Sequence, residues 1–302
     1  MAFPLDDAPE DVRKLMAEIG PRWAQDHRRH VEMTFDAYAA LLAGVSNEGV
    51  EVTRNLAYGE HPRQVLDVFR PQGAARAPVI VFAHGGAFVR GDKRVRPEIY
   101  DNVLYYFARR GLVGVNLEYR LAPEATFPEG ARDVARAVAW IEREIAAFGG
   151  DPKRIFLFGS SAGGTHVATY VFDRTAIPER SASVAGAILA SARVRADVLP
   201  DNPNADAVRA YFGADDSLYE SRSPVTHAND AHLPVFIVVA EYENPYLDVY
   251  GAELLHKLSR ARRQAPRFLR LTRHNHISLV AHFNTGEEIL GREILDFISR
   301  GC

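Results

Sequence analysis

RIFLFGSSAGGTHVATYV, residues 154–171, runs from apolar residues into a glycine, two serines and further small residues. An apolar pattern with helical spacing follows the small residues. Small side chains at such a junction let a strand turn sharply into a helix. The stretch therefore predicts a buried strand over 154–158, a tight turn, and a helix that begins near residue 162.

The turn fits the pattern G-x-S-x-G, with Ser161 at its centre between Gly159 and Gly163. In this context the central residue adopts a strained backbone conformation, and its side chain projects above the edge of the sheet. Ser161 is therefore the candidate nucleophile, and Ser160 is interpreted as structural. The alternative is a glycine-rich turn that carries no chemistry.

Strand-like and helix-like patterns alternate along most of the chain, which predicts an α/β protein with a mostly parallel sheet flanked by helices. Two amphipathic helices, over 8–20 and 31–42, precede the first strand, and the polar stretch 192–230 interrupts the alternation with one helix near 204–212. Further strands are expected at 50–56, 64–69, 78–83, 112–117, 184–190, 234–240 and 267–272, and further helices at 97–110, 130–147, 248–262 and 286–299.

A second motif, VFAHGGAFVRGDK at residues 81–93, follows one of the predicted strands. Consecutive glycines let backbone N–H groups converge on one point, as an oxyanion hole requires. The expected donors are the amides of Gly85, Gly86 and Ala162. His84 precedes the glycines, so we interpret it as a residue that orients the loop. The alternative is an ordinary tight turn after a strand.

Composition and charge exclude several classes of function. A net charge of −3 gives no electrostatic case for binding nucleic acid or an anionic membrane. No apolar run approaches the length of a membrane span, and the acidic start of the chain does not resemble a signal peptide. The only cysteine is Cys302, which excludes an internal disulfide. A cytoplasmic protein is therefore expected.

The motifs together resemble a known family. HGGAF, EYRLAPE at 118–124, FP at 127–128 and GSSAGG at 159–164 resemble, in order and spacing, the hormone-sensitive-lipase-like carboxylesterase branch of the α/β-hydrolases. The resemblance implies the α/β-hydrolase fold, a Ser–His–acid catalytic triad, and ester hydrolysis without metal or cofactor. It also implies that residues 1–48 and 192–230 contribute a helical cap to a catalytic domain over 49–302. Ala87 departs from a third glycine in many members, and no loss is expected because the hole uses only N–H groups.

The general base is expected last in the chain, where RHNHISLVAHFNTGEE offers three histidines. The resemblance favours His276, which follows the predicted strand 267–272. His274 and His282 are its rivals. His274 and His276 also form an H-x-H pair, but no acidic or cysteine ligand clusters beside them, so no metal site is expected.

The acid is expected after the strand 234–240, in the segment EYENPYLD. Asn244 stands where a direct overlay would put the family's aspartate, and an amide cannot stabilise an imidazolium as a carboxylate does. An overlay on arylformamidase-like relatives favours Glu243. Asp248 is the rival acid, although we expect it to open the next helix, and Glu241 is the third choice.

These residues predict a serine hydrolase that cleaves a small-molecule ester, with a short acyl or aryl group, through an acyl-enzyme. One alternative is amide hydrolysis of the arylformamidase-like kind, which the acid and histidine loops resemble. Another is a non-catalytic member of the fold that binds a small ligand. Hydrolase subunits often pair through the last strand and helix, so a homodimer stays open.

Overall fold

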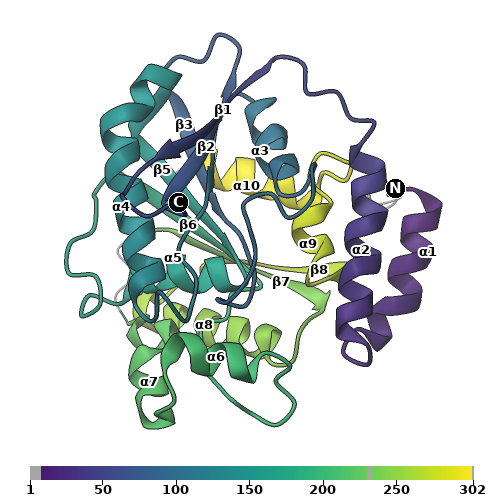
Figure 1. The fold of residues 1–302 in the computed structure, drawn as a ribbon, viewed down its shortest axis with the longest axis vertical. Coiled ribbons are helices and arrows are strands. Elements are labelled where there is room, and N and C mark those ends of the chain that lie inside the picture. The colour runs from purple at the N-terminus through teal and green to yellow at the C-terminus, as the bar shows by residue number, and fades with distance from the viewer. Residues whose placement is uncertain (1–7, 230–232, 301–302) are drawn as a thin grey trace.

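A single eight-stranded sheet forms the centre of the described chain, residues 8–229 and 233–300 of a computed structural model (Figure 1). The chain ends, including Cys302, lie outside the described residues. The strands are β1 (Val50–Ala57), β2 (Val65–Pro71), β3 (Ala77–Ala83), β4 (Val113–Leu117), β5 (Gly150–Ser160), β6 (Val184–Ala190), β7 (Val235–Tyr242) and β8 (Arg267–Asn275).

The strands follow the order β1-β2-β4-β3-β5-β6-β7-β8 across the sheet. β2 is antiparallel to both of its neighbours, and every pair from β4 to β8 is parallel. The expected mostly parallel sheet is therefore confirmed. Its parallel strands end on one edge, where open α/β folds place their ligands.

Helices cover both faces of the sheet and also form two additions to it. The main helices are α1 (Glu10–Ile19), α2 (His27–Leu42), α3 (Asp101–Ala108), α4 (Glu129–Glu144), α5 (Ala162–Phe172), α6 (Ala205–Phe212), α8 (Leu247–Arg262) and α10 (Ile289–Arg300). Shorter turns are η1 (Gly20–Arg22), η2 (Ile145–Phe148), η3 (Asp216–Leu218), α7 (Tyr219–Arg222), η4 (Pro224–His227) and α9 (Ser278–Ala281).

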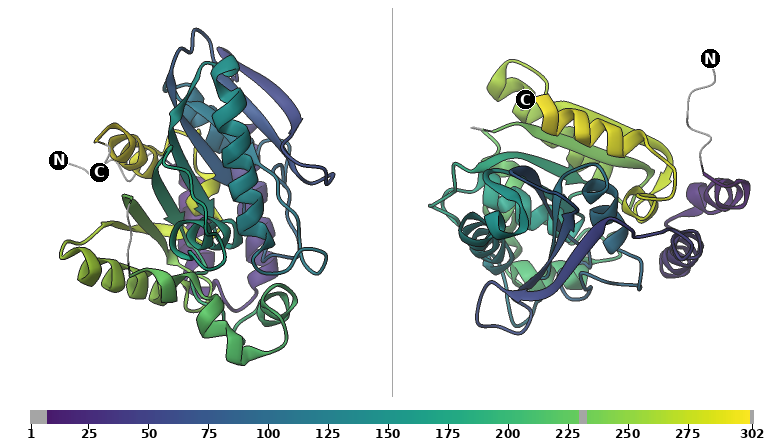
Figure 2. Two further views of the ribbon diagram at one scale, coloured as in Figure 1. Left: turned by 90° about the vertical axis from the view of Figure 1, so that its left-hand side faces the viewer. Right: turned by 90° about the horizontal axis from the view of Figure 1, so that it is seen from above.

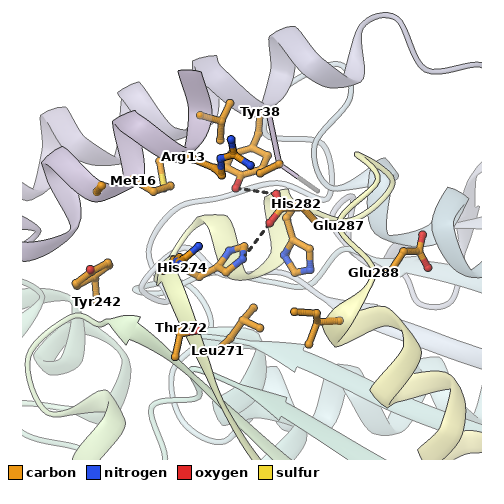
Figure 3. A pocket seen from close by; sticks show the side chains of 15 residues that line it. Arg13, Met16, Tyr38, Tyr242, Leu271, Thr272, His274, His282, Glu287 and Glu288 are labelled. Atoms are coloured by element: carbon orange, nitrogen blue, oxygen red, sulfur yellow. Dashed lines mark hydrogen bonds and ion pairs between the residues drawn. The ribbon is translucent and has the colours of Figure 1, made fainter. Parts of the chain in front are cut away.

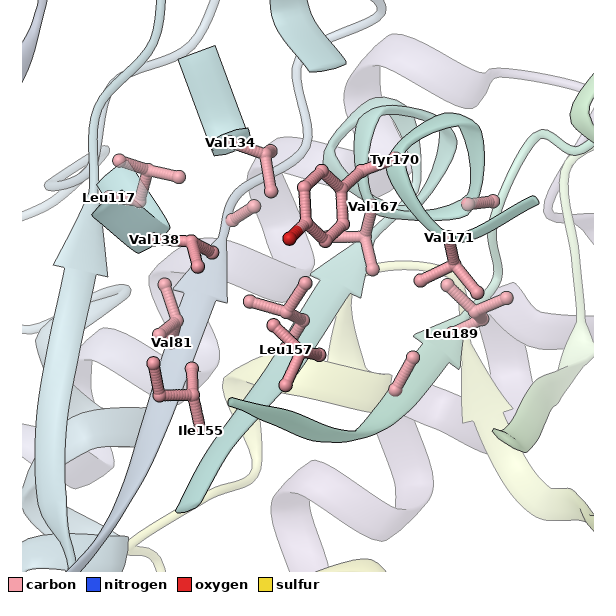
Figure 4. Packing of buried hydrophobic residues seen from close by; sticks show 14 of the residues in the cluster. Val81, Leu117, Val134, Val138, Ile155, Leu157, Val167, Tyr170, Val171 and Leu189 are labelled. Atoms are coloured by element: carbon pink, nitrogen blue, oxygen red, sulfur yellow. The ribbon is translucent and has the colours of Figure 1, made fainter. Parts of the chain in front are cut away.

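The apolar run of β5 supplies both cores. Ile155 and Leu157 point to the face covered by α4, α5 and α8, where they join the cluster drawn in Figure 4. Phe156 and Phe158 point to the opposite face, which α3 and α10 cover. Successive side chains of a strand face opposite sides, so a strand buried on both faces is apolar throughout.

The two N-terminal helices lie side by side at one end of the molecule, next to the end of β8 and to α9 (Figures 1 and 2). Their apolar residues, such as Met16 and Phe35, join the core on the α3 and α10 face. The excursion 192–230 contains α6 and α7, and α6 packs through Tyr211 and Phe212 on Phe88 of the loop after β3.

The largest differences from the expected helix starts are at α3 and α2. The helix predicted over 97–110 begins only at Asp101, and the Ile99 carbonyl just before it accepts from the Arg96 amide at 3.0 Å, which is a loop bond and not a helical one. The helix predicted over 31–42 begins earlier, at His27. Its first turn is polar, so the apolar pattern used for the prediction did not reveal it.

Among the described helices, none combines the length and hydropathy that crossing a bilayer requires.

His166 of α5 is buried beneath α6. Its ring contacts Phe88, Tyr119 and Tyr211, and its Nδ1 lies 3.2 Å from the Tyr211 hydroxyl. Burial lowers its pKa to about 3 from the ordinary 6.5, because the charged ring would lose its hydration. The folded protein therefore holds this imidazole neutral at pH values where the unfolded chain protonates it.

We expect His166 to weaken the fold as the pH falls below about 6.5, since the unfolded state then binds the extra proton. Each pH unit in this window costs about 1.4 kcal/mol, so the loss by pH 5 is roughly 2 kcal/mol. His166→Asn removes this titration, so the unfolding free energy in urea should fall less steeply between pH 7 and pH 5, by up to about 1.4 kcal/mol per pH unit, while His27 and His282 keep their own contributions. The exposed His256→Asn is the matched control. Equal slopes in the two variants would contradict the assignment.

Candidate active site

Ser161 occupies the turn between β5 and α5, with φ 52° and ψ −119°. Its amide donates to the carbonyl of Ala190 at 3.0 Å, which fixes the turn against β6. A Cβ at Gly159 would lie 2.6 Å from the Gly163 carbonyl oxygen, and one at Gly163 would overlap the backbone at the end of β3. Ser161 is partly exposed, whereas Ser160 is buried.

His276 and Glu243 meet at the same edge of the sheet, from the loops after β8 and β7. His276 Nδ1 lies 2.8 Å from Glu243 Oε2, and the two side chains are 7% and 3% exposed. Glu243 Oε1 accepts hydrogen bonds from the Ala240 amide at 2.9 Å and from the Ser191 hydroxyl. Both carboxylate oxygens are therefore held, and one is aimed at the imidazole.

The other candidates for the acid make different contacts. Asp248 is exposed in the first turn of α8, where its carboxylate accepts from the amide of Val249 at 2.9 Å. Glu241 accepts from the amide of Arg273 at 2.6 Å. Asn244 is buried, and its Oδ1 accepts from Trp23 Nε1 at 2.8 Å. Glu243 is thus the candidate that the structure pairs with His276.

Ser191 is a site residue that sequence reasoning missed. It follows directly after β6, is fully buried, and has φ 46°. The available signal was its position, because a polar residue at the carboxyl end of a buried parallel strand faces the edge where ligands bind. Its hydroxyl contact with Glu243 ties the acid loop to the neighbouring strand.

The loop after β3 brings Gly85 and Gly86 to the nucleophile. A Cβ placed on Gly85 would lie 3.1 Å from the Cβ of Ser161. Gly86 has φ 145°, and a side chain there would overlap the carbonyl of Arg90. Among the described residues, no hydrogen bond is found from the amides of these two glycines. Their N–H groups are therefore available next to Ser161.

His84 holds this loop in place through contacts of both its ring nitrogens. Its Nδ1 lies 2.6 Å from the Gly85 carbonyl oxygen and its Nε2 lies 3.0 Å from Glu118 Oε1, while its ring stacks on Tyr119 at 4.5 Å. Burial favours the neutral form of Glu118, but His84 and Arg63 outweigh it and hold the pKa of this carboxyl below its usual value. Both ring nitrogens of His84 are occupied, so neither serves Ser161.

A cavity of about 210 Å³ connects these groups, and we call it the site cavity. Ser161, His276, Gly85 and Gly86 line it together with residues of α2 and of the excursion 192–230. Its remaining lining residues are His27, Val31, Glu32, Phe35, Ala87, Arg90, Gly91, Val95, Tyr100, Ser160, Asn204, Asn244, Ile277 and Val280.

His274 and His282 line a different cavity, of about 200 Å³, between α1, α2 and the end of β8 (Figure 3). His274 Nε2 lies 3.2 Å from Glu287 Oε2, and the Tyr38 hydroxyl donates to Glu287 Oε1 at 3.1 Å. Burial lowers the pKa of His282 to about 4. The H-x-H pair is thus split between two cavities, and the described residues contain no group of three side chains suited to hold a metal ion.

The strand order, the strained turn at Ser161 and the paired His276 and Glu243 after the last two parallel strands together define the α/β-hydrolase fold. This chain has that fold. An esterase of Pyrobaculum calidifontis superposes with a TM-score of 0.71 at 22% identity, covering 97% of this chain and 98% of that one. A bacterial heroin esterase gives a TM-score of 0.70 at 24% identity, covering 92% of each chain.

Sequence comparison also finds similarity to esterases. A family model described as BD-FAE matches residues 66–175. A probable isoprenylcysteine alpha-carbonyl methylesterase of Arabidopsis thaliana is 30% identical over 201 residues, which cover 65% of this chain and 42% of the relative. The chain thus spans less than half the length of this relative. The expected fold and the expected resemblance to carboxylesterases are confirmed.

Proposed function

We propose that the chain is a serine carboxylesterase that works through an acyl-enzyme. The observation that carries the proposal is the buried bond of 2.8 Å between His276 and Glu243, on the same cavity as Ser161 in its strained turn. A nucleophile, a base and a group that orients the base are the parts that acyl transfer requires.

In the proposed mechanism, Ser161 Oγ attacks the ester carbonyl while His276 takes its proton. The amides of Gly85, Gly86 and Ala162 donate to the oxyanion that forms. His276 then passes the proton to the departing alkoxide, which leaves as the alcohol. Water, activated by His276 in turn, hydrolyses the acyl-serine and releases the carboxylic acid.

Glu243 holds the imidazole of His276 in the tautomer that leaves Nε2 free to accept the serine proton, and its charge stabilises the imidazolium. The bond to Nδ1 has the position for that role. Ser191 and the Ala240 amide fix the other carboxylate oxygen, so the acid does not have to be ordered during the reaction.

The site cavity supports an ester with a short acyl or aryl group. Its volume of about 210 Å³ lies below the roughly 300–1,000 Å³ of pockets that hold drug-sized ligands. Phe35, Tyr100 and Ile277 give it apolar walls. Amide hydrolysis of the arylformamidase-like kind stays the second candidate, because Glu243 is the acid that this overlay favours.

A substrate panel tests the proposal. We expect p-nitrophenyl acetate and butyrate to exceed the octanoate by roughly tenfold or more in kcat/KM, because added methylenes exceed the space available. N-formyl aromatic amides should be slower than all short esters. Ser161→Ala, measured alongside, supplies the rate that does not depend on the site. Faster turnover of the amides would favour the second candidate, and faster turnover of emulsified long-chain lipid would reject the short-acyl assignment.

The division of the chain is part of the proposal: residues 49–302 form the catalytic domain, and residues 1–48 and 192–230 form its cap. The lining of the site cavity by α2 and Asn204 supports this division. A cytoplasmic location and a homodimer stay predictions.

A further inference from the structure

Buried hydrogen bonds at two places, Asn244 and Asn275, join the N-terminal helices to the candidate catalytic loops. The first runs from Trp23 Nε1, just after η1, to Asn244 Oδ1 at 2.8 Å. Trp23 is 2% exposed and Asn244 is 4% exposed, so water does not compete for this bond. Asn244 is the residue directly after Glu243.

The second bond runs from Asn275 Nδ2 to the Thr34 hydroxyl of α2 at 3.0 Å, and the same nitrogen also lies 3.3 Å from Met16 Sδ of α1, a weak acceptor. Thr34 and Asn275 are both fully buried, and the threonine donates its own proton to the His30 carbonyl at 2.8 Å. Asn275 Oδ1 meanwhile accepts from the amides of Ile277 and Ser278 at 3.0 and 2.9 Å. Asn275 is the residue directly before His276, and its side chain shapes the turn that carries this histidine.

The two bonds therefore end one residue away from the acid and one residue away from the base. The loops are also joined to each other, because the His276 amide donates to the Tyr242 carbonyl at 3.0 Å. Neither Trp23 nor Thr34 lines the site cavity. Thr34 therefore acts on the reaction through the loop that it holds, whereas Trp23 also contacts the ring of His27, a lining residue of the cavity, at 5.4 Å between ring centroids.

We propose that Trp23 and Thr34 are positioning residues, which set the distance and angle between His276 and Glu243. This inference rests on the proposed function. It makes the N-terminal helices part of the catalytic apparatus, in addition to any role they have in covering the cavity.

Loss of one donor or acceptor from these bonds weakens the hydrogen bonding of a buried amide. Without the indole N–H, Asn244 loses the donor to its buried oxygen, and it gains by moving toward another donor such as the neighbouring His27. Such a movement shifts the adjacent Glu243. A displacement of about 1 Å at a reacting group lowers the rate by as much as 10²-fold, although substrate binding is little changed.

The sharpest test uses Thr34, where variants of nearly equal volume are available. Thr34→Val removes the oxygen acceptor for Asn275 and leaves only the weak sulfur acceptor of Met16, so we expect kcat for p-nitrophenyl butyrate to fall by about tenfold while KM stays within about twofold. Thr34→Ser retains the hydroxyl and should retain kcat. Trp23→Phe removes the other bond and should lower kcat in the same way.

Tyr170→Phe is the matched control. Tyr170 lies near the end of α5 and is 2% exposed, and its hydroxyl accepts from the amide of Ser181, which precedes β6 at the end of the sheet opposite to both loops, at 3.0 Å. This variant should lose stability but keep kcat. If Thr34→Val keeps full kcat, or if Tyr170→Phe loses as much as Thr34→Val, the positioning role is rejected. Should Trp23→Phe fail to fold, the Thr34 series decides alone.

A spectroscopic measurement separates this inference from the proposed function. The proton between His276 Nδ1 and Glu243 gives a far-downfield NMR signal, which His276→Gln would identify by its loss. We expect the signal to broaden or move in Thr34→Val and to stay unchanged in Thr34→Ser and Tyr170→Phe. An unchanged signal in Thr34→Val would overturn the inference even in an active esterase. Absence of esterase activity in the unaltered protein would instead reject the proposed function.

Discussion

Ser161→Ala is expected to lower kcat for p-nitrophenyl butyrate by about 10⁴-fold or more, the size of effect seen when a triad nucleophile is removed. The variant loses the hydroxyl that the strained turn presents at the site cavity beside His276 and the two glycines. Because the side chain is small and partly exposed, the fold should remain intact. Steady-state rates and thermal unfolding of the same preparation measure both expectations.

Ser160→Ala is the control for this substitution. Ser160 is the last residue of β5 and is buried, so its loss should change kcat only a few-fold. An active Ser161→Ala together with an inactive Ser160→Ala would move the nucleophile by one residue. That outcome would contradict the proposed mechanism.

Glu243→Gln is expected to lower kcat by about 10²- to 10⁴-fold, by analogy with the neutralisation of other triad acids. The amide keeps the shape of the side chain but removes the charge next to His276 Nδ1, at 2.8 Å. It also allows a tautomer in which Nδ1 accepts and Nε2 carries the proton, and Nε2 then cannot take the proton of Ser161. Rates on one activated ester, with a check of folding, give the measurement.

Asp248→Asn is measured beside it. Asp248 is exposed at the start of α8, where its carboxylate accepts from the adjacent amide of Val249, so the change should cost at most about 1 kcal/mol of stability and little activity. If Asp248→Asn were the inactive variant and Glu243→Gln the active one, the proposed acid would be wrong. The amide alternative, which depends on the overlay of Glu243, would lose its support as well.

The core of the fold could be predicted from the sequence because its signals are local. The apolar run 155–158 predicted a strand over 154–158, but β5 extends over Gly150–Ser160. The additional residues are held by pairing, Gly150 with Ala77 of β3 and Ser160 with Ala190 of β6. Such pairing depends on segments distant in sequence, and the polar residues 151–154 carry no apolar pattern that would reveal it.

Some residues of the candidate site could likewise be predicted from local sequence patterns, and others could not. The turn around Ser161 and the glycine loop at 85–86 are marked by short patterns, so they could be located before the structure was known. Glu243 and Asp248 are only five positions apart in the sequence, and the structure places Glu243 in the loop after β7 and Asp248 in solvent on the first turn of α8. The bonds from Trp23 and Thr34 span 221 and 241 residues of sequence, and no local pattern predicts them.

The buried hydrogen bonds at Trp23 and Thr34 also affect how substrate enters the site cavity and how products leave it. Elsewhere in the lining of the site cavity, Arg90 Nη2 donates to Asn204 Oδ1 at 3.2 Å in an exposed position. Water can replace that bond at little cost, whereas it cannot reach the bonds at Trp23 and Thr34 without opening the core. We therefore expect ester to enter, and alcohol and acid to leave, past Asn204, while the wall formed by α2 stays shut throughout the cycle.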